Sequence, residues 1–175
     1  MHRKDDKVFW LVLLIIVFIS GTSSGFFGPN LVQFVLFKHG DTFLILTAFL
    51  ANILTFVATG FFTLFCIGML SYNKKLNYLG ILFLVVSITT GYLSNLGYYT
   101  LVSDEGIVIS NITKQTYSWT DITEAAYIDK NNEPLRKIHL TFNDGKEETL
   151  EINKVLVQEI GRIQQKFLKN DINFK

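Results

Sequence analysis

Side chains that could bind a metal or act as a nucleophile are few and scattered in this sequence. The histidines His2, His39 and His139 lie far apart in the chain, and the only cysteine, Cys66, lies inside an apolar run. A structural zinc site gathers about four such ligands, and a reactive thiol needs an activating neighbour, which Cys66 lacks. We therefore expect no metal site. We interpret Cys66 as a packing residue, with palmitoylation or redox sensing as the alternative.

Carboxylates also gather in one acidic run, formed by Glu147, Glu148 and Glu151. Two facing carboxylates could serve a glycoside hydrolase, but a strand that exposes one face to water carries similar residues, and we favour that interpretation. The sequence contains no phosphate-binding loop, nucleophile elbow or zinc-protease motif. It therefore predicts a protein that is not an enzyme and that uses no cofactor.

The compact basic cluster of the C-terminal half consists of Lys130, Arg136 and Lys137. It is a candidate contact for lipid headgroups or for a partner, although solvated loops often carry such residues. Trp119 is a second candidate contact, because an accessible indole ring can stack on a ligand. Its apolar neighbours in the sequence favour a position in the core or at its rim instead.

Polar side chains also occur inside long apolar stretches. Asn52 and Asn95 each carry an amide that needs a partner in lipid, and Thr55 and Thr59 follow Asn52 closely. These four residues could line a transport path. They could also form hydrogen bonds between helices that only fix packing, which is the interpretation we favour. No Asp, Glu, Lys, Arg or His lies deep in these stretches, which argues against a proton-coupled transporter.

Three stretches are long and apolar enough to cross a membrane as helices, which takes about 20 residues. They are residues 8–27, 43–70 and 78–99, within a membrane region at 1–99. Backbone amides find no hydrogen-bond partners in lipid, so we expect α-helices there. The stretch 31–37 is too short to span and is predicted to be interfacial or re-entrant. The first stretch could alternatively be a cleaved signal peptide.

Small residues four positions apart mark helix faces that can approach each other closely. Gly21 and Gly25 form one such pair, and Ser87 and Gly91 form another. Small side chains let two backbones come together in lipid. We therefore expect both pairs at contacts between helices.

The distribution of basic residues predicts an orientation. Basic residues occur at the N-terminus and at Lys74 and Lys75, and cytoplasmic loops of membrane proteins are enriched in such residues. Three spans would then place the N-terminus in the cytoplasm and the C-terminal domain outside, in a multi-pass protein of the plasma membrane. The formal net charge of +1 argues against a nucleic-acid partner, which would need a basic patch.

The hydrophobic pattern changes over residues 100–175. Short runs alternate apolar and polar residues, and Asp144-Gly145 separates two of them. Alternation predicts half-buried strands, and an Asp-Gly pair predicts a hairpin. After a predicted N-cap at Asn153, apolar residues at helical spacing predict a final helix. We expect an α+β domain in which an antiparallel sheet or barrel of about six or seven strands is capped by this helix. The helical apolar residues are Leu156, Ile160, Ile163 and Phe167.

The order of these elements resembles a known family. Hydrophobic helices, the segment Tyr-Ser-Trp-Thr-Asp-Ile at 117–122, an Asp-Gly hairpin and a final helix are together similar to the bacterial pleckstrin-homology-like (PH-like) domain of small membrane proteins. The resemblance covers roughly residues 98–169 and implies a PH-like fold on a membrane tether. That domain is usually pictured in the cytoplasm, which disagrees with the charge rule. Some related proteins look like immunity factors against leaderless bacteriocins.

These patterns favour a membrane-anchored, non-enzymatic interaction module of the bacterial envelope. Its partners would be the lipid bilayer and a membrane or envelope protein or peptide, and its role would lie in bacteriocin immunity or envelope stress. The alternative is an accessory subunit of a transporter, or a small transporter that works through Asn52 and Asn95.

Overall fold

The structure is a computed structural model that describes residues 2–38, 40–71, 73–128, 137–151 and 154–174. It divides into two compact units, which we call the helical unit and the sheet unit. The helical unit contains residues 1–36, 47–99 and 111–113, and the sheet unit contains residues 37–46, 100–110 and 114–175. The predicted boundary after residue 99 falls between these units. The chain at 37–46, by contrast, is part of the sheet unit, although the sequence places it in the membrane region.

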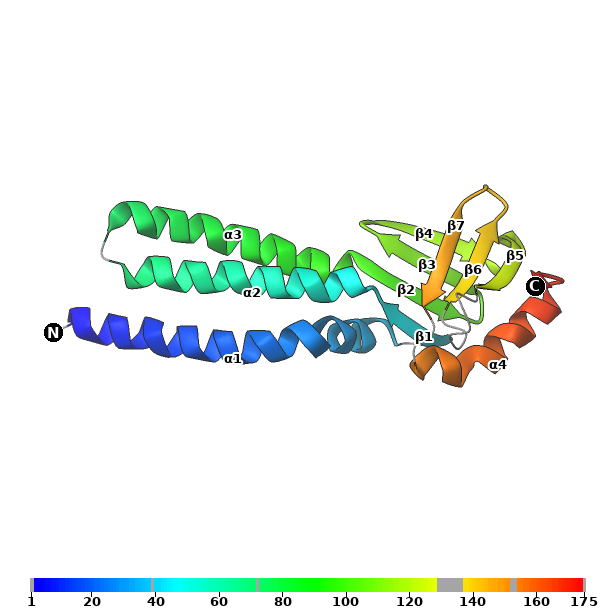
Figure 1. The fold of residues 1–175 in the computed structure, drawn as a ribbon, viewed down its shortest axis with the longest axis horizontal. Coiled ribbons are helices and arrows are strands. Elements are labelled where there is room, and N and C mark those ends of the chain that lie inside the picture. Colours follow the sequence, from blue (N-terminus) through cyan, green and yellow to red (C-terminus); the bar gives the residue numbers. More distant parts are fainter. Residues whose placement is uncertain (1, 39, 72, 129–136, 152–153, 175) are drawn as a thin grey trace. The chain divides into compact units, whose positions relative to one another are not determined.

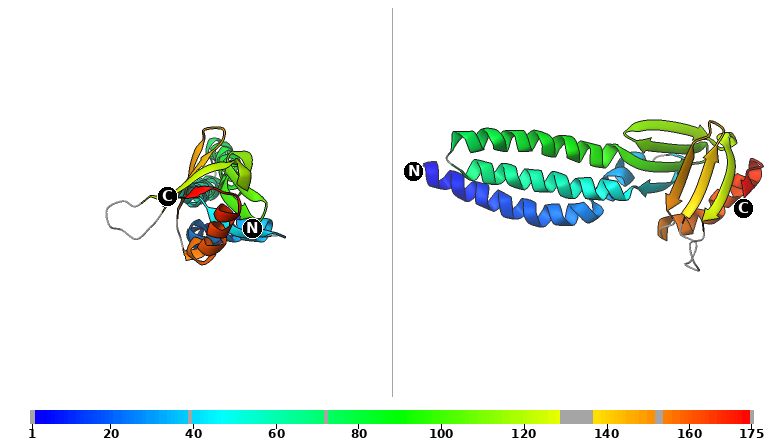
Figure 2. Two further views of the ribbon diagram at one scale, coloured as in Figure 1. Left: turned by 90° about the vertical axis from the view of Figure 1, so that its right-hand side faces the viewer. Right: turned by 45° about the horizontal axis from the view of Figure 1, so that its top comes forward.

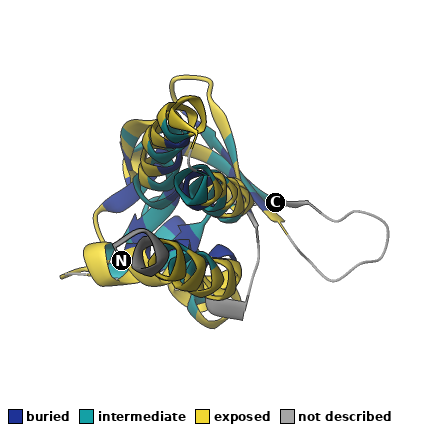
Figure 3. Ribbon diagram, turned by 90° about the vertical axis from the view of Figure 1, so that its left-hand side faces the viewer, coloured by how far each residue is buried: buried dark blue, intermediate teal, exposed yellow. Residues whose placement is uncertain are grey.

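Three long helices build the helical unit: α1 (His2–Phe37), α2 (Phe49–Leu70) and α3 (Lys74–Leu96). All three are long and apolar enough to cross a membrane, which confirms that prediction. At about 1.5 Å per residue, α2 and α3 are each a little longer than a hydrocarbon core of about 30 Å. Their outward faces are exposed (Figure 3) and carry large apolar side chains, as expected for helices that lie in lipid.

Helix α1 is longer than the sequence predicts. The sequence predicts a helix at 8–27 and a separate piece at 31–37, but one continuous helix runs through both and contains Pro29. A proline removes one backbone hydrogen bond. Pro29 is buried against the rest of the protein, and a proline inside a membrane helix is tolerated where neighbouring groups satisfy the freed backbone. At about 54 Å, α1 is longer than the hydrocarbon core, so part of it extends beyond the core.

The second and third spans also differ from the prediction at their ends. Residues Thr42–Thr47 form strand β1 rather than the beginning of α2, because a short apolar run fits a strand and a helix equally well. Helix α3 begins and ends earlier than the predicted range of 78–99. Its first turn is capped by Asn73, whose side chain accepts a hydrogen bond from the backbone N–H of Lys75 (3.0 Å).

Each helix runs antiparallel to the next one in the sequence. The rings of Trp10 and Phe65 lie 5.4 Å apart, so the beginning of α1 packs against the end of α2. Between α2 and α3, the hydroxyl of Ser87 donates to the carbonyl of Ala58 (2.7 Å). The three helices lie side by side (Figure 2). As a result, the N-terminal end of α1 and the link between α2 and α3 lie at the same end of the helical unit (Figure 1).

The small-residue pairs lie at contacts between helices, as predicted. A Cβ atom on Gly21 would lie 2.1 Å from Cγ2 of Thr59, and one on Gly25 would lie 2.4 Å from the ring of Phe56. In the other pair, Gly91 faces Ala58 at ordinary contact distance, next to the hydrogen bond from Ser87. Glycine therefore permits the close approach of α1 to α2.

The strands form two four-stranded sheets with the orders β1-β2-β3-β4 and β7-β6-β5-β8. Strand β5 pairs antiparallel with β6, and β6 pairs antiparallel with β7, whereas the short β8 pairs in parallel with β5. The sequence does not predict β1 and β8. Besides β1, the strands are β2 (Tyr98–Ser103), β3 (Gly106–Asn111), β4 (Thr113–Ser118), β5 (Ile122–Ile128), β6 (Lys137–Phe142), β7 (Glu147–Glu151) and β8 (Asn173–Phe174).

The predicted hairpin and final helix are both present. Gly145 has a φ of 79° and its N–H donates to the carbonyl of Phe142 (3.0 Å), which closes the turn between β6 and β7. Helix α4 (Lys154–Lys169) ends the domain, and its predicted N-cap, Asn153, lies outside the described residues. The predicted apolar face of α4 packs on the core: Leu156, Ile163 and Phe167 are buried, and Ile160 is partly buried.

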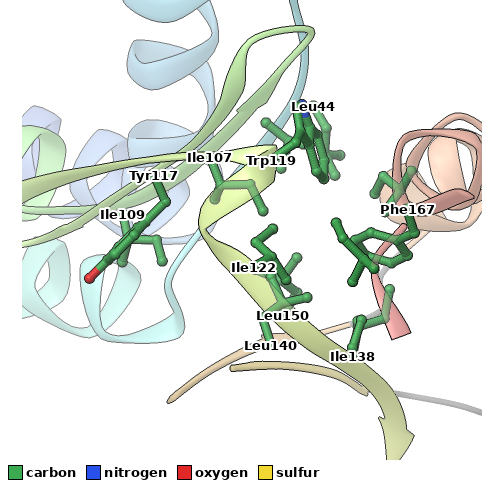
Figure 4. Packing of buried hydrophobic residues seen from close by; sticks show 14 of the residues in the cluster. Leu44, Ile107, Ile109, Tyr117, Trp119, Ile122, Ile138, Leu140, Leu150 and Phe167 are labelled. Atoms are coloured by element: carbon green, nitrogen blue, oxygen red, sulfur yellow. The ribbon is translucent and has the colours of Figure 1, made fainter. Parts of the chain in front are cut away.

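The core of the sheet unit is one apolar cluster between the strands and α4. Phe167 of α4 faces Ile122 and Leu150, and Trp119 lies beside Leu44 (Figure 4). Leu44 comes from β1, so the chain between α1 and α2 supplies part of this core. The α+β class of the C-terminal half, with antiparallel strands and a C-terminal helix, is confirmed.

Candidate functional site

The side chain of Gln33, in α1, is polar and has no exposed surface. Its Nε2 donates to the carbonyl oxygens of Asn95 and Tyr98 (3.1 Å each), and its Oε1 accepts from the hydroxyl of Thr47 (2.7 Å). Asn95 lies in the last turn of α3, where helix carbonyls have no partner within the helix. Gln33 therefore caps α3 and joins its end to α1 and to Thr47.

The two candidate intramembrane contacts, Asn52 and Asn95, lie at the same level of the helical unit. The residues before them are joined, because the hydroxyl of Ser94 donates to the carbonyl of Ala51 (2.7 Å). The amide of Asn95 donates to the carbonyl of Gly91 within α3 (2.7 Å). The Oδ1 atom of Asn52 is buried, and within the described part of the chain it has no hydrogen-bond partner.

The threonines near Asn52 form hydrogen bonds that hold helices together. Thr55 and Thr59 donate to carbonyl oxygens one turn earlier in α2 (3.1 and 2.9 Å). The hydroxyl of Thr55 also lies 2.5 Å from that of Ser94 in α3. Bonds to helix backbones and to a neighbouring helix favour a packing role for these residues over a transport path.

Trp119 is buried in the sheet unit, with 4% of its surface exposed. Its indole N–H donates to the carbonyl oxygens of Ser103 and Asp104 (3.2 and 3.1 Å), and its ring packs edge-on against Phe167. The ring is therefore not free to stack on a ligand, and a contact of Trp119 with lipid or a partner stays a prediction. A buried ring is a core anchor, the other interpretation that the sequence allows, and here it also holds the turn between β2 and β3.

The residues around Trp119 explain the Tyr-Ser-Trp-Thr-Asp-Ile segment. Ser118 accepts a hydrogen bond from the N–H of Thr120 (3.1 Å), and Asp121 accepts one from the N–H of Ser118 (2.8 Å). This reciprocal capping box closes a single 3-10 turn, η1 (Trp119–Asp121). The chain then enters β5 at Ile122, which is buried. The segment thus reverses the chain while it sends three large side chains, Tyr117, Trp119 and Ile122, into the core.

Asp104 connects the turn between β2 and β3 to helix α4. Its carboxylate accepts hydrogen bonds from Arg162 (2.8 Å) and Lys166 (2.9 Å). Hydrogen bonds from Lys166 and, to a smaller extent, from Arg162 lower the pKa of Asp104 below its ordinary value. The ionised form of this carboxylate is therefore favoured. The guanidinium of Arg162 also lies 4.1 Å from the centre of the Phe43 ring, a cation–π contact with β1.

A polar cleft of about 230 Å³ opens beside this ion pair. Two carboxylates and two ammonium groups line it, so the formal charges of its walls cancel. The hydroxyl groups of Ser118 and Thr120, which lie 2.5 Å apart in the capping turn, add donor and acceptor atoms. The residues that line this cleft, which we call the Asp104 cleft, are Asp104, Glu105, Ser118, Trp119, Thr120, Lys166, Lys169 and Asn170.

Only one residue of the predicted basic cluster is described by the structure. Lys130 and Arg136 fall outside the described residues, and Lys137 is an exposed residue at the beginning of β6. His139 pairs with Glu147 across β6 and β7 (3.4 Å). In the described ranges, no group of three or more histidine, cysteine or acidic side chains could hold a metal ion.

Sequence reasoning missed both Gln33 and the Asp104 cleft. Gln33 carries a detectable signal, since it is an amide in the middle of the apolar run at 31–37. The cleft carries none, because its walls come from the turn after β2, the turn before β5 and the end of α4, which only the fold brings together.

Comparison with known proteins gives no relative. No protein-family model, no curated protein and no solved structure matches this chain.

Proposed function

We propose that this protein is a membrane-anchored, non-enzymatic interaction module of the bacterial plasma membrane. Its sheet unit, which we assign to the PH-like class, binds a polypeptide segment of another membrane or envelope protein. The Asp104 cleft is the binding site, and bacteriocin immunity or envelope stress is the setting. The observation that carries this proposal is the cleft itself, with both signs of charge and several hydroxyl groups.

The charges of the cleft favour a polypeptide over a phosphate-bearing headgroup. A phosphate would approach Lys169 but would also face the carboxylates of Asp104 and Glu105, and like charges at short range repel. A peptide carries backbone donors and acceptors as well as side chains of both signs. It can therefore satisfy Glu105, Lys169 and the hydroxyl groups together.

The arrangement of basic residues supports an orientation for the module. Lys7 at the beginning of α1 and Lys74 and Lys75 at the beginning of α3 lie at one end of the helical unit (Figure 1). By the positive-inside rule this end faces the cytoplasm. Because three spans separate the two ends of the chain, the sheet unit would then lie on the outer side of the membrane.

Photo-crosslinking in intact cells tests the proposed binding site. A photoreactive amino acid at Thr120, on the wall of the cleft, is expected to give a discrete cross-linked polypeptide in the full-length protein. The same amino acid at Thr116, an exposed position on β4, serves as the matched control and should give none. Charge reversal by Lys169→Glu should remove the product at Thr120, because the peptide would lose its cationic contact.

A product that persists in the Lys169→Glu variant, or that forms equally at Thr116, would contradict binding in the cleft. A lipid adduct in place of a polypeptide would favour a headgroup ligand and overturn the choice of partner.

A further inference from the structure

We propose that Ile112, at the turn between β3 and β4, is a lipid-contacting residue that lies in the interfacial region of the bilayer. This inference is independent of the partner that the Asp104 cleft binds. It is based on the conformation of the turn, on its exposure and on its attachment to the end of a membrane-spanning helix.

The backbone of Ile112 has an unusual conformation for its residue type. Its φ is 68°, in the left-handed region, where a β-branched side chain crowds the neighbouring carbonyl. At the other positive-φ positions in the described ranges, Gly40, Gly145 and Asp171, the residue types tolerate this region. Asparagine or glycine would remove the strain at position 112 if the turn simply faced water. An isoleucine there needs another reason.

The side chain of Ile112 is 64% exposed, so it does not reach the core of either unit. A single exposed isoleucine is ordinary on a soluble protein. Here exposure coincides with backbone strain, so neither packing nor backbone preference explains the residue type. An apolar environment outside the protein would favour it.

The turn is attached to the end of helix α3. The N–H of Ile112 donates to the carbonyl of Gly97 (2.7 Å), and Gly97 is the C-cap of α3. Residues 111–113 belong to the same compact unit as the three helices. The position of Ile112 relative to the bilayer is therefore set by α3.

The length of α3 places Gly97 near a membrane surface. From Lys74, whose ammonium group favours one interface, the helix runs for about 35 Å, slightly more than the hydrocarbon core. Tyr92, just over one turn before the C-cap, is 65% exposed, as expected for an aromatic residue at the opposite interface. Ile112 lies against this end of α3, so its exposed side chain meets interfacial lipid.

Lipid suits this side chain better than a protein partner. One exposed apolar residue offers far less area than a specific protein interface requires. Lipid, by contrast, already surrounds the helix to which the turn is bonded. Contact with it would offset the cost of the strained backbone and would hold the β3–β4 turn at the membrane surface.

Spin labels in the full-length protein can test this placement in lipid bilayers. In a Cys66→Ala background, a nitroxide is attached at Ile112→Cys. Matched labels are placed at Lys114→Cys, two residues further along β4, and at Ile88→Cys, on the exposed face of α3. Relaxation by oxygen, which concentrates in lipid, is compared with relaxation by a water-soluble nickel chelate.

We expect the ratio of oxygen to nickel relaxation at position 112 to lie between the ratio at 88, which faces the hydrocarbon core, and the ratio at 114, where nickel should dominate. A label at 112 that matches the one at 114 would overturn the proposal. If the position-112 variant does not accumulate, Thr113→Cys provides the same test. Its oxygen relaxation should exceed that at 114, and equal values would overturn the proposal as well.

Discussion

Replacement of Gln33 by leucine is expected to cause a large loss of stability in the helical unit. Leucine has nearly the same volume but cannot donate to the carbonyls of Asn95 and Tyr98 or accept from the hydroxyl of Thr47. A buried polar group without a partner costs about 1–3 kcal/mol, and the three partners of Gln33 are partly buried, so we expect a total cost of about 3 kcal/mol. For a chain of this size, this corresponds to a thermal midpoint lowered by about 6–12 °C.

The thermal unfolding midpoint of each variant is measured in the same detergent. The variant Asn30→Leu provides the matched control. Asn30 lies one turn before Gln33 in α1, but its side chain is exposed and donates to the carbonyl of Phe26 in its own helix (3.4 Å). Its replacement should leave the midpoint nearly unchanged. Equal midpoints for the two variants would show that the hydrogen bonds of Gln33 do not stabilise the helical unit.

A methyl group at Gly106 is expected to disrupt the sheet unit. A Cβ atom there would lie 2.0 Å from the carbonyl oxygen of Tyr117 and 2.9 Å from the Cα of Ser118. Both contacts are with backbone atoms of β4, so the clash can be relieved only if β3 and β4 move apart. Overpacking of this kind costs about 1–3 kcal/mol of stability. The cost of Gly106→Ala should lie at or above the upper limit of this range, because the clashing atoms belong to the backbone and no side chain can move away.

The fluorescence of Trp119 can measure this disruption. Trp10 is first replaced by phenylalanine, so that Trp119 is the one remaining tryptophan. Trp119 follows the clashing segment directly and is bonded to the turn before Gly106, so its emission should shift to the red and its unfolding midpoint should fall. Gly161→Ala, in α4, is the control. A methyl group there meets nothing within 4 Å, and alanine favours a helix by about 1 kcal/mol. A Gly106→Ala variant as stable as the parent would refute the close approach of β3 and β4.

Much of the fold could be predicted because lipid and water impose different patterns on a chain. The uncharged stretches of α2 and α3 leave few alternatives to a helix. Alternation in residues such as Ile138, Leu140 and Phe142 marks the buried face of β6. Asp144-Gly145 marks its turn. In these cases a local property of the residues determines the local structure.

Other elements depend on the rest of the fold and were not predictable from local patterns. The residues of β1 are as apolar as those of α2, and only pairing with β2 makes them a strand. Pro29 usually ends a helix, yet α1 continues to Phe37, and Gln33, one turn after the proline, is bonded to the end of α3.

The candidate site was less predictable than the fold. Lys137 and Trp119 are candidate contacts by residue type, as a cation and a large aromatic ring. Their roles depend on how far each is buried, which the sequence does not specify. The Asp104 cleft forms only after α4 brings Arg162 and Lys166 to a turn about 60 residues earlier in the chain. Residue type alone did not indicate this partnership.

Alkaline extraction of cell membranes in the absence of detergent, together with protease treatment of a separate sample of sealed vesicles, tests the account most directly. The three apolar helices should keep the full-length chain in the membrane pellet, because their exposed faces have no stable place in water. Protease added to one side should remove the sheet unit and leave the helical fragment protected. Release of the intact chain into the supernatant would contradict the assignment of lipid as the solvent of α1, α2 and α3.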